Sequence, residues 1–260
     1  MADLIHCITN PISMMQCANA VLSLGACPIM AEHPMEVRQI TETASALLLN
    51  TGNISDSRME AMEISYETAL EKSIPIVIDA VGVACSDLRR DYVFKLLNKH
   101  PHHAKSFLVL KGNYSEIKAL AVNSYKGKGV DADKSIEAGE MQEIAHKLAA
   151  DLGTVILASG ETDIVTDGGK TILVKAGTPM LGQITGTGCM LGAVCATFLA
   201  GEPRIEAVAG ACEFFGNAGE KAYKNLYEKN GEVGAGSYLI GLLDSLSFEK
   251  YGETNEKNRQ

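Results

Sequence analysis

The chain has 260 residues, 46% of them hydrophobic, which suits a single α/β domain over residues 1–260. Its formal net charge is −9 and it has no basic tract, which argues against nucleic acid or an anionic membrane as a partner. The first residues show no basic start followed by an apolar core, as a signal peptide would, so we expect a cytoplasmic protein.

Short apolar runs alternate with longer helical patterns along the first 160 residues. We expect strands at residues 27–31, 46–50, 74–81, 106–111 and 154–159, with helices between them, for example at residues 57–72 and 86–99. Ser57, followed three residues later by Glu60, is typical of a capping box at a helix start. Apolar strands with intervening helices predict an α/β fold with a mostly parallel sheet covered on both faces.

Residues 163–176 interrupt this alternation. Asp167, Gly168 and Gly169 lie between two strand-like runs, which indicates a hairpin. The following Lys-Thr makes the segment resemble part of a P-loop, but Ile164 stands where that motif needs a glycine, and a strand follows instead of a helix. Beyond this hairpin, residues 187–246 are almost wholly helical in pattern, with a break near residues 231–236.

Two glycines open an uncharged apolar run, GTGCMLGAVCATFLA, at residues 186–200. Because the preceding residues are loop-like, Gly186 and Gly188 are predicted to lie at a helix amino terminus, where free amides and the helix dipole attract a phosphate. Tight packing of a buried helix start would explain the glycines equally well. Cys189 alone would be a core residue more often than a catalytic one. The seven cysteines are irregularly spaced and include no C-x-x-C pair, so neither a disulfide framework nor a zinc site is indicated.

Four predicted strands end in a polar residue followed closely by glycine. These residues are Asn50, Asp79, Lys111 and Ser159, and Glu116 comes shortly after the strand that ends in Lys111. Any one of them could be solvated surface, but ligands of open parallel sheets bind beyond the carboxyl ends of the strands. Together with the glycine-rich helix start they predict phosphoryl transfer without a P-loop. Asp79 and Glu116 would hold Mg²⁺, Lys111 would neutralise phosphate, and the amides of residues 186–189 would stabilise the transferred group.

These blocks resemble, in order and spacing, the hydroxyethylthiazole kinase family of the ribokinase-like superfamily. The resemblance covers nearly the whole chain: HCITNPISMMQCANAVLSLGACPIMA (6–31), LLLNTGN (47–53), IPIVIDAVG (74–82), LKGNYSEI (110–117), GVDA (129–132), ASGETDIVTDG (158–168), TGTGCMLGA (185–193) and GEVGAGSYLIGLLDSL (231–246). The first block is the most specific. Cys189 stands where other ribokinase-like enzymes place aspartate.

The resemblance implies a ribokinase-like three-layer fold and Mg²⁺-dependent transfer of the γ-phosphate of ATP to the hydroxyl of hydroxyethylthiazole in thiamine salvage. It also implies a homotrimer with thiazole sites between neighbouring subunits. By motif, the thiazole-binding positions are Asn10, Met30, Gly52 and Gly186, the ATP-binding positions are Lys111 and Ser159, the magnesium positions are Asp79 and Glu116, and the catalytic position is Cys189.

Four positions depart from the family's usual residues: Ala80 replaces proline, Lys111 replaces arginine, and Ser159 and Asn53 replace threonine. Ala80 is expected to loosen the loop after Asp79, and lysine lacks the bidentate geometry of arginine. A helix amino terminus can lower the pKa of a thiol and its basicity with it. We therefore expect Cys189 mainly to position the substrate hydroxyl, since a loose transition state asks little of a base.

Other functions remain open. Hydroxymethylpyrimidine kinases and nicotinamide-nucleotide repair dehydratases share the superfamily, but the block at residues 6–30 argues against both. A non-catalytic thiazole- or nucleotide-binding regulator is a further alternative, and the intact acidic and glycine positions argue against it. His100, His102 and His103 predict an exposed turn without a metal, and residues 250–260 predict a frayed tail.

Overall fold

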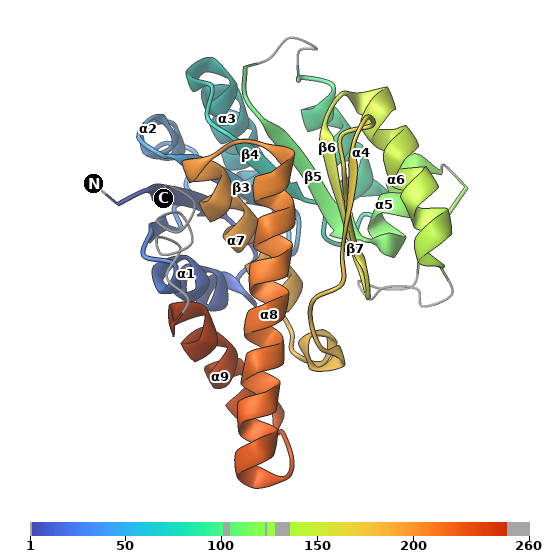
Figure 1. The fold of residues 1–260 in the computed structure, drawn as a ribbon. Helices are drawn as coiled ribbons and strands as arrows, with labels where there is room; N and C mark the ends of the chain where they lie inside the picture. The colour runs from blue at the N-terminus through green and yellow to red at the C-terminus, as the bar shows by residue number, and fades with distance from the viewer. Residues whose placement is uncertain (1, 101–104, 123, 128–135, 249–260) are drawn as a thin grey trace, which may run out of the picture.

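The computed structural model describes residues 2–100, 105–122, 124–127 and 136–248 (Figure 1). Within them, one sheet has the strand order β2-β1-β3-β4-β5-β6-β7-β8. The strands are β1 (Leu4–Ile8), β2 (Cys27–Ile29), β3 (Ala46–Asn50), β4 (Ile76–Asp79), β5 (Leu108–Asn113), β6 (Val155–Ser159), β7 (Asp163–Thr166) and β8 (Thr171–Val174). The first six pair in parallel and the last two antiparallel, which confirms the predicted mostly parallel sheet.

Helices cover both faces of this sheet. One core lies under α1 (Met14–Ser23), α7 (Thr187–Gly201), α8 (Ile205–Asn230) and α9 (Ala235–Phe248). The other lies under α2 (Val37–Glu42), α3 (Asp56–Lys72), α4 (Asp87–Leu97), α5 (Tyr114–Ala121) and α6 (Ala138–Leu152). A short 3₁₀ helix, η1 (Pro179–Gln183), precedes α7. In Figure 1, α8 extends past the sheet and α9 returns beside it.

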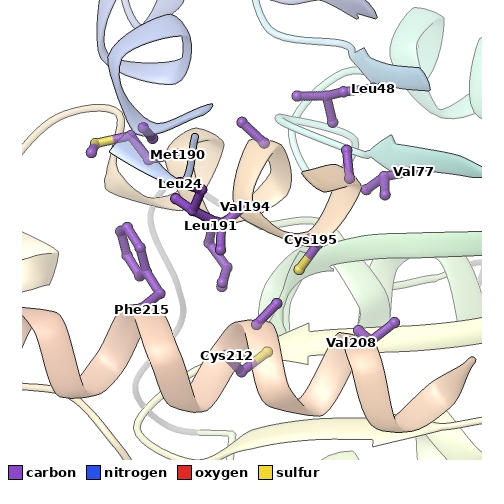
Figure 2. Close-up of a cluster of buried hydrophobic side chains, with 14 of the residues drawn as sticks. Leu24, Leu48, Val77, Met190, Leu191, Val194, Cys195, Val208, Cys212 and Phe215 are labelled. Carbon is purple, nitrogen blue, oxygen red and sulfur yellow. The ribbon is translucent and has the colours of Figure 1, made fainter. Parts of the chain in front are cut away.

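The helix α7 fills the space between the sheet and α8, as Figure 2 shows. Leu48 of β3 and Val77 of β4 approach it from the sheet, and Val208 approaches from α8. The absence of charge along α7 follows from burial on both sides. Because side chains alternate along a strand, Asn50 and Asp79, two residues after Leu48 and Val77, face the same layer as α7. The sheet thereby directs its strand-end polar groups toward this helix.

The structure corrects several sequence predictions. The strand β1 was missed. The predicted strand at 27–31 ends two residues early, that at 74–81 is shorter by two residues at each end, and that at 106–111 is shifted by two residues toward the carboxyl terminus. The capping box at Ser57 is wrong: Ser55 caps α3 by accepting from the Arg58 amide, so Ser57 lies inside the first turn. The hairpin is confirmed, with the Asp167 carboxylate accepting from two amides of its turn. A second break, at residues 202–204, separates α7 from α8.

The remaining predictions concern less regular segments. His100 is half-buried, with Nε2 3.4 Å from the Ser106 carbonyl oxygen, so it is not in an exposed turn. The GVDA block, His102, His103 and residues 250–260 lie outside the described residues. None of the helices in the described part of the chain combines the length and apolarity needed to cross a membrane.

Candidate active site

Three strand-end residues form a row across neighbouring strands. Asn50 pairs in register with Asp79, and Asp79 pairs with Lys111. The Asn50 amide donates to Asp79 Oδ2 at 2.9 Å, and Lys111 Nζ donates to Asp79 Oδ1 at 2.9 Å. All three side chains are buried. Both oxygens of the central carboxylate therefore receive a hydrogen bond from its own sheet.

Asn10 extends this row to the first turn of α7. It follows β1 and is buried, and its Nδ2 donates to Asn50 Oδ1 at 3.2 Å and to Cys189 Sγ at 3.3 Å. An amide NH₂ group has two donors, so both bonds can form together. Asn10 Oδ1 accepts from the Ser13 amide at 3.0 Å, which fixes the orientation of the Asn10 side chain. We call the series Cys189–Asn10–Asn50–Asp79–Lys111 the polar chain.

Two glycines are required by this packing. A Cβ at Gly52 would lie 2.9 Å from both Asn10 Nδ2 and Asn50 Oδ1, and the Gly52 amide donates to the same Asn50 oxygen. Gly186 is the N-cap of α7 with φ of 93°, a left-handed conformation, and a Cβ there would lie 2.9 Å from Ser13 Cβ. The tight-packing explanation of Gly186 is therefore correct, and it places the free amides of α7 beside the polar chain.

Cys189 differs from the expectation in its ionisation. Burial raises the pKa of the Cys189 thiol, and the nearby Asp79 carboxylate raises it further, against smaller effects of Ser13, Lys111 and Asn10. The Cys189 thiol is therefore protonated at neutral pH. A neutral thiol can hold a hydroxyl group in place, which agrees with the positioning role, but it is a poor proton acceptor at neutral pH.

The Asp79–Lys111 pair is an ion pair inside the protein. Burial opposes the charged form of both groups: it pushes the pKa of Asp79 upward, whereas Lys111 and Asn50 pull it down. Burial is the largest single effect on the pKa of Lys111 and lowers it, but the attractions of Asp79, Cys189 and Glu116 together raise this pKa overall. We regard the pair as ionised because two donors converge on one carboxylate. Lys111 thus reaches the site as part of this pair and not as a solvent-exposed cation.

Glu116 connects the ends of β4 and β5. Its Oε1 accepts from the Gly82 amide at 2.8 Å, and its Oε2 accepts from the Asn113 amide at 2.7 Å as part of a capping box on α5. Burial, followed by the charge of Asp79, raises the pKa of Glu116 to about 7. Glu116 therefore lies close enough to Asp79 for the two carboxylates to repel each other.

These two carboxylates fit a hydrated magnesium ion better than a stripped one. Every oxygen of Asp79 and Glu116 already accepts one hydrogen bond, which leaves further lone pairs but no unbonded oxygen. In the described part of the chain, no three His, Cys, Asp or Glu side chains gather as a metal centre. Mg²⁺ commonly keeps several waters and uses few protein ligands. Contact through its water shell is compatible with this geometry.

The other predicted residues flank the polar chain. Ser159 ends β6 half-buried, with Oγ donating to the Gly112 carbonyl at 3.3 Å. Met30 follows β2 and packs, partly buried, against the core that contains α7. Sequence reasoning did not single out Asn50 or Ser13 as site residues, although Asn50 stood among the strand-end residues.

Two departures from the family pattern have a structural explanation. Ala80 is fully buried, and its amide donates to the Lys111 carbonyl at 2.8 Å, a bond that proline could not make. The loop after Asp79 is therefore tied to β5 by a backbone hydrogen bond that depends on alanine at this position. Asn53 has φ of 49°, and its carbonyl accepts from Arg58 Nη1 at 2.6 Å, so an ion-paired arginine holds this strained residue.

Two cavities lie away from the polar chain. One, of about 330 Å³, opens at the amino ends of β5 and β6, near Phe107, Gly153 and Asp167. The other, of about 340 Å³, lies along α3. Neither contains a residue of the polar chain. We place the site at the carboxyl ends of the strands because the convergent polar groups, and not the hollows, carry the chemistry.

Comparison with known proteins identifies the family of this chain. A profile of the hydroxyethylthiazole kinase family matches residues 1–250. A hydroxyethylthiazole kinase 2 of Clostridium botulinum (strain Hall) is 43% identical over 249 residues, which are 94% of this chain and 89% of the relative. The hydroxyethylthiazole kinase of Finegoldia magna is 38% identical over 254 residues, covering 98% of this chain and 90% of the relative.

Solved structures show the same similarity. The structure of a hydroxyethylthiazole kinase from Pyrococcus horikoshii matches with a TM-score of 0.81 at 32% identity, covering 95% of this chain and 89% of that one. A Bacillus subtilis pyridoxal kinase in an ADP complex matches with a TM-score of 0.59 at 19% identity, covering 86% and 92%, and shares the fold alone.

Proposed function

The chain belongs to the hydroxyethylthiazole kinase family, and we propose that it transfers the γ-phosphate of ATP to the primary hydroxyl of 4-methyl-5-(2-hydroxyethyl)thiazole, as in thiamine salvage. The observation that carries the proposal is the polar chain, which links Cys189 at the start of α7 to the buried Asp79–Lys111 pair. The polar chain connects the Cys189 thiol, which can bind an alcohol, to the charged Asp79–Lys111 pair near the expected phosphate position.

Each part of the site has a defined task in this proposal. The neutral Cys189 thiol and the Asn10 amide hold the substrate hydroxyl, next to the free amides that begin α7. Those amides and the α7 dipole stabilise charge on the transferred phosphoryl group. Positioning and charge neutralisation carry most of the rate, because a loose transition state needs little help from a base.

The nucleotide binds at the Lys111 end of the polar chain, opposite Cys189. We place the ATP phosphates near Lys111 and Ser159, at the adjacent ends of β5 and β6. Magnesium, when bound, would neutralise the phosphate oxygens, and Asp79 and Glu116 are the residues that would hold its water shell. The thiazole-binding part of the site, near Cys189 and Asn10, is completed by Gly52, Gly186 and Met30.

We also propose an assembly and a compartment. A homotrimer would place Met30 or the exposed side chains beside Asn10 near a neighbouring subunit. All seven cysteines are free thiols, as is usual in a reducing compartment, and we assign the enzyme to the cytoplasm.

The deciding experiment is a comparison of acceptors. Purified protein with ATP and Mg²⁺ should phosphorylate hydroxyethylthiazole with a kcat/KM well above that for hydroxymethylpyrimidine. Preference for the pyrimidine would favour the superfamily alternative. Tight binding of the thiazole without turnover would favour a regulator, and activity only on a hydrated nicotinamide nucleotide would favour a dehydratase.

A further inference from the structure

The turn between β6 and β7, residues 160–162, is held from two sides. Asp163 Oδ1 accepts from the Gly160 amide at 3.0 Å. From the other side, the Tyr114 hydroxyl donates to the Thr162 carbonyl at 2.6 Å, and this hydroxyl is buried. The turn directly follows Ser159, so its backbone position fixes where that residue can reach.

Gly160 lets the Tyr114 ring lie against the turn. A Cβ at this glycine would lie 2.8 Å from two carbon atoms of the ring, closer than real contacts allow. The glycine's φ is not in the left-handed region, so the requirement is for space and not for backbone conformation. Ring and turn are therefore in direct contact over the glycine.

Tyr114 itself has a rigid base. It is the first residue of α5 and lies between Asn113, the N-cap, and Glu116, whose carboxylate closes the capping box. Asn113 pairs in register with Ser159, and the Ser159 hydroxyl donates to the Gly112 carbonyl. One side chain thus joins the Ser159 turn to the helix start that carries Glu116.

We propose that Tyr114 is a positioning residue for the nucleotide: by clasping the turn at Gly160 and Thr162 it fixes Ser159 relative to Lys111 and Glu116. The inference rests on the proposed function, because it takes the ends of β5 and β6 as the place of the ATP phosphates. Tyr114 does not touch the thiazole side of the polar chain, so its loss should weaken ATP recognition selectively.

The test removes one hydroxyl and keeps the ring. In Tyr114→Phe we expect KM for ATP to rise about three- to ten-fold, the range that one lost hydrogen bond supplies, with KM for the thiazole changed less than about two-fold. Tyr92→Phe is the matched control. The Tyr92 hydroxyl donates to the Met59 carbonyl at 2.7 Å and the side chain is as buried as that of Tyr114. Both variants should lose similar thermal stability, and only Tyr114→Phe should shift KM for ATP.

A second pair of variants tests the contact over the glycine. Gly160→Ala should raise KM for ATP at least as much as Tyr114→Phe, because the turn must move away from the ring. Gly139→Ala in α6, where a Cβ would meet nothing within 4 Å, should leave it unchanged. Equal KM values for ATP in Tyr114→Phe and Tyr92→Phe would overturn the inference.

Calorimetric binding of a non-hydrolysable ATP analogue separates this inference from the proposed function. If the wild-type protein binds the analogue but does not phosphorylate the thiazole, and Tyr114→Phe still weakens binding, the function is wrong and the inference stands. If the wild-type protein phosphorylates the thiazole and Tyr114→Phe binds the analogue normally, only the inference fails. If the wild-type protein binds no nucleotide, both fail.

Discussion

Cys189 is a buried thiol with Asn10 Nδ2 3.3 Å from its sulfur, at the first turn of an otherwise apolar helix. If it positions the hydroxyl, Cys189→Ser should keep activity within about ten-fold of the parent, because serine offers a similar small polar group. Cys189→Leu should lose at least about a hundred-fold in kcat through displacement of the substrate. Cys189→Asp should remain active, since the α7 amino terminus and Lys111 offset the added charge.

Steady-state rates with hydroxyethylthiazole decide among these outcomes. Cys27→Ser is the control, because Cys27 is an exposed thiol on β2 and its loss should change nothing. Undiminished activity in Cys189→Leu would show that this residue lies outside the site.

Lys111 is buried, so its removal is expected to affect the stability of the protein as well as its use of ATP. Lys111→Ala would leave the Asp79 carboxylate buried without its partner, at a cost of about 3–5 kcal/mol in the free energy of unfolding. A rise in KM for ATP has to be separated from this loss. Lys111→Arg keeps the charge and should fold and use ATP.

Urea unfolding beside ATP kinetics measures both effects. Lys126→Ala is the control, because Lys126 and Asp87 form a similar pair at 3.1 Å that is largely exposed, and its loss should cost less than about 1 kcal/mol. Equal destabilisation in the two alanine variants would show that the Asp79–Lys111 pair is not the buried ion pair described above.

Asp163 predicts a pH dependence. Burial raises its pKa from 3.8 to about 6, so between these values the folded protein holds more protons than the unfolded chain. The contribution of Asp163 to stability is thus fully present below about pH 4 and is lost as pH rises through 6. Asp163→Asn, which still accepts from the Gly160 amide, should gain up to about 2 kcal/mol at pH 7.5 and nothing at pH 4. The measurement is the free energy of unfolding of the wild-type protein and of Asp163→Asn at pH 7.5 and at pH 4. The same difference between the two proteins at both pH values would contradict the prediction.

The sequence predicted which residues gather at the site better than it predicted their bonds. The carboxyl ends of parallel strands lie at the same end of a sheet, so the sequence placed Asp79 and Lys111 at one end without giving the order of their strands. Their pairing with each other, and the role of Asn50 between them and Asn10, depend on register and on which face each side chain takes. Those are long-range features that no local pattern encodes.

At the scale of the element, α8 provides a matched pair of glycines. A Cβ at Gly216 would lie 2.5 Å from the Ala176 backbone carbon, so Gly216→Ala should destabilise the protein by about 1–3 kcal/mol through overpacking. Gly210, on the same helix, has its nearest neighbour at 3.7 Å. Gly210→Ala should be neutral or stabilise by up to about 1 kcal/mol, because alanine is the better helix former. Thermal and urea unfolding compare the two, and a similar effect of both substitutions would contradict the close approach of α8 to residue 176.

Element boundaries failed where distant residues decide them. The strand β1 was missed because His6 interrupts its apolar run, yet the ring is buried with Nδ1 2.9 Å from Thr41 Oγ1 and Nε2 2.9 Å from the Ala31 carbonyl. A polar residue becomes a core residue once distant partners satisfy it. The capping pattern at Ser57 is a valid local signal, but the chain enters α3 two residues earlier, where Arg58 also holds the preceding loop.

At the scale of the whole molecule, we propose that the chain is one domain. Its first strand pairs within the sheet that the last helices cover, so neither half has a core of its own. The surface beside the site, however, carries large exposed apolar side chains. Ile12 and Met15 are 56% and 69% exposed next to Asn10 and Ser13. Exposed apolar side chains at this place are what a subunit interface would cover.

Assembly and activity should therefore be lost together. Met15→Asp should lower the molecular mass measured by light scattering from that of a trimer and reduce kcat/KM in parallel. Leu173→Asp is the control, since Leu173 is 48% exposed on β8 at the far edge of the sheet and should alter neither property. A fully active monomer would exclude shared sites.

Mixing inactive subunits tests the shared site directly. Met30 packs, partly buried, against the core that contains Cys189, and we predict that in a trimer it completes the thiazole site of a neighbour. Met30→Asp and Cys189→Leu should each be inactive alone. After dissociation and reassembly together, a closed ring pairs an intact Met30 with an intact Cys189 at about a quarter of its sites, and activity should return to that extent. If Met30 acts within its own subunit, every site of the mixture keeps one defect and no activity returns.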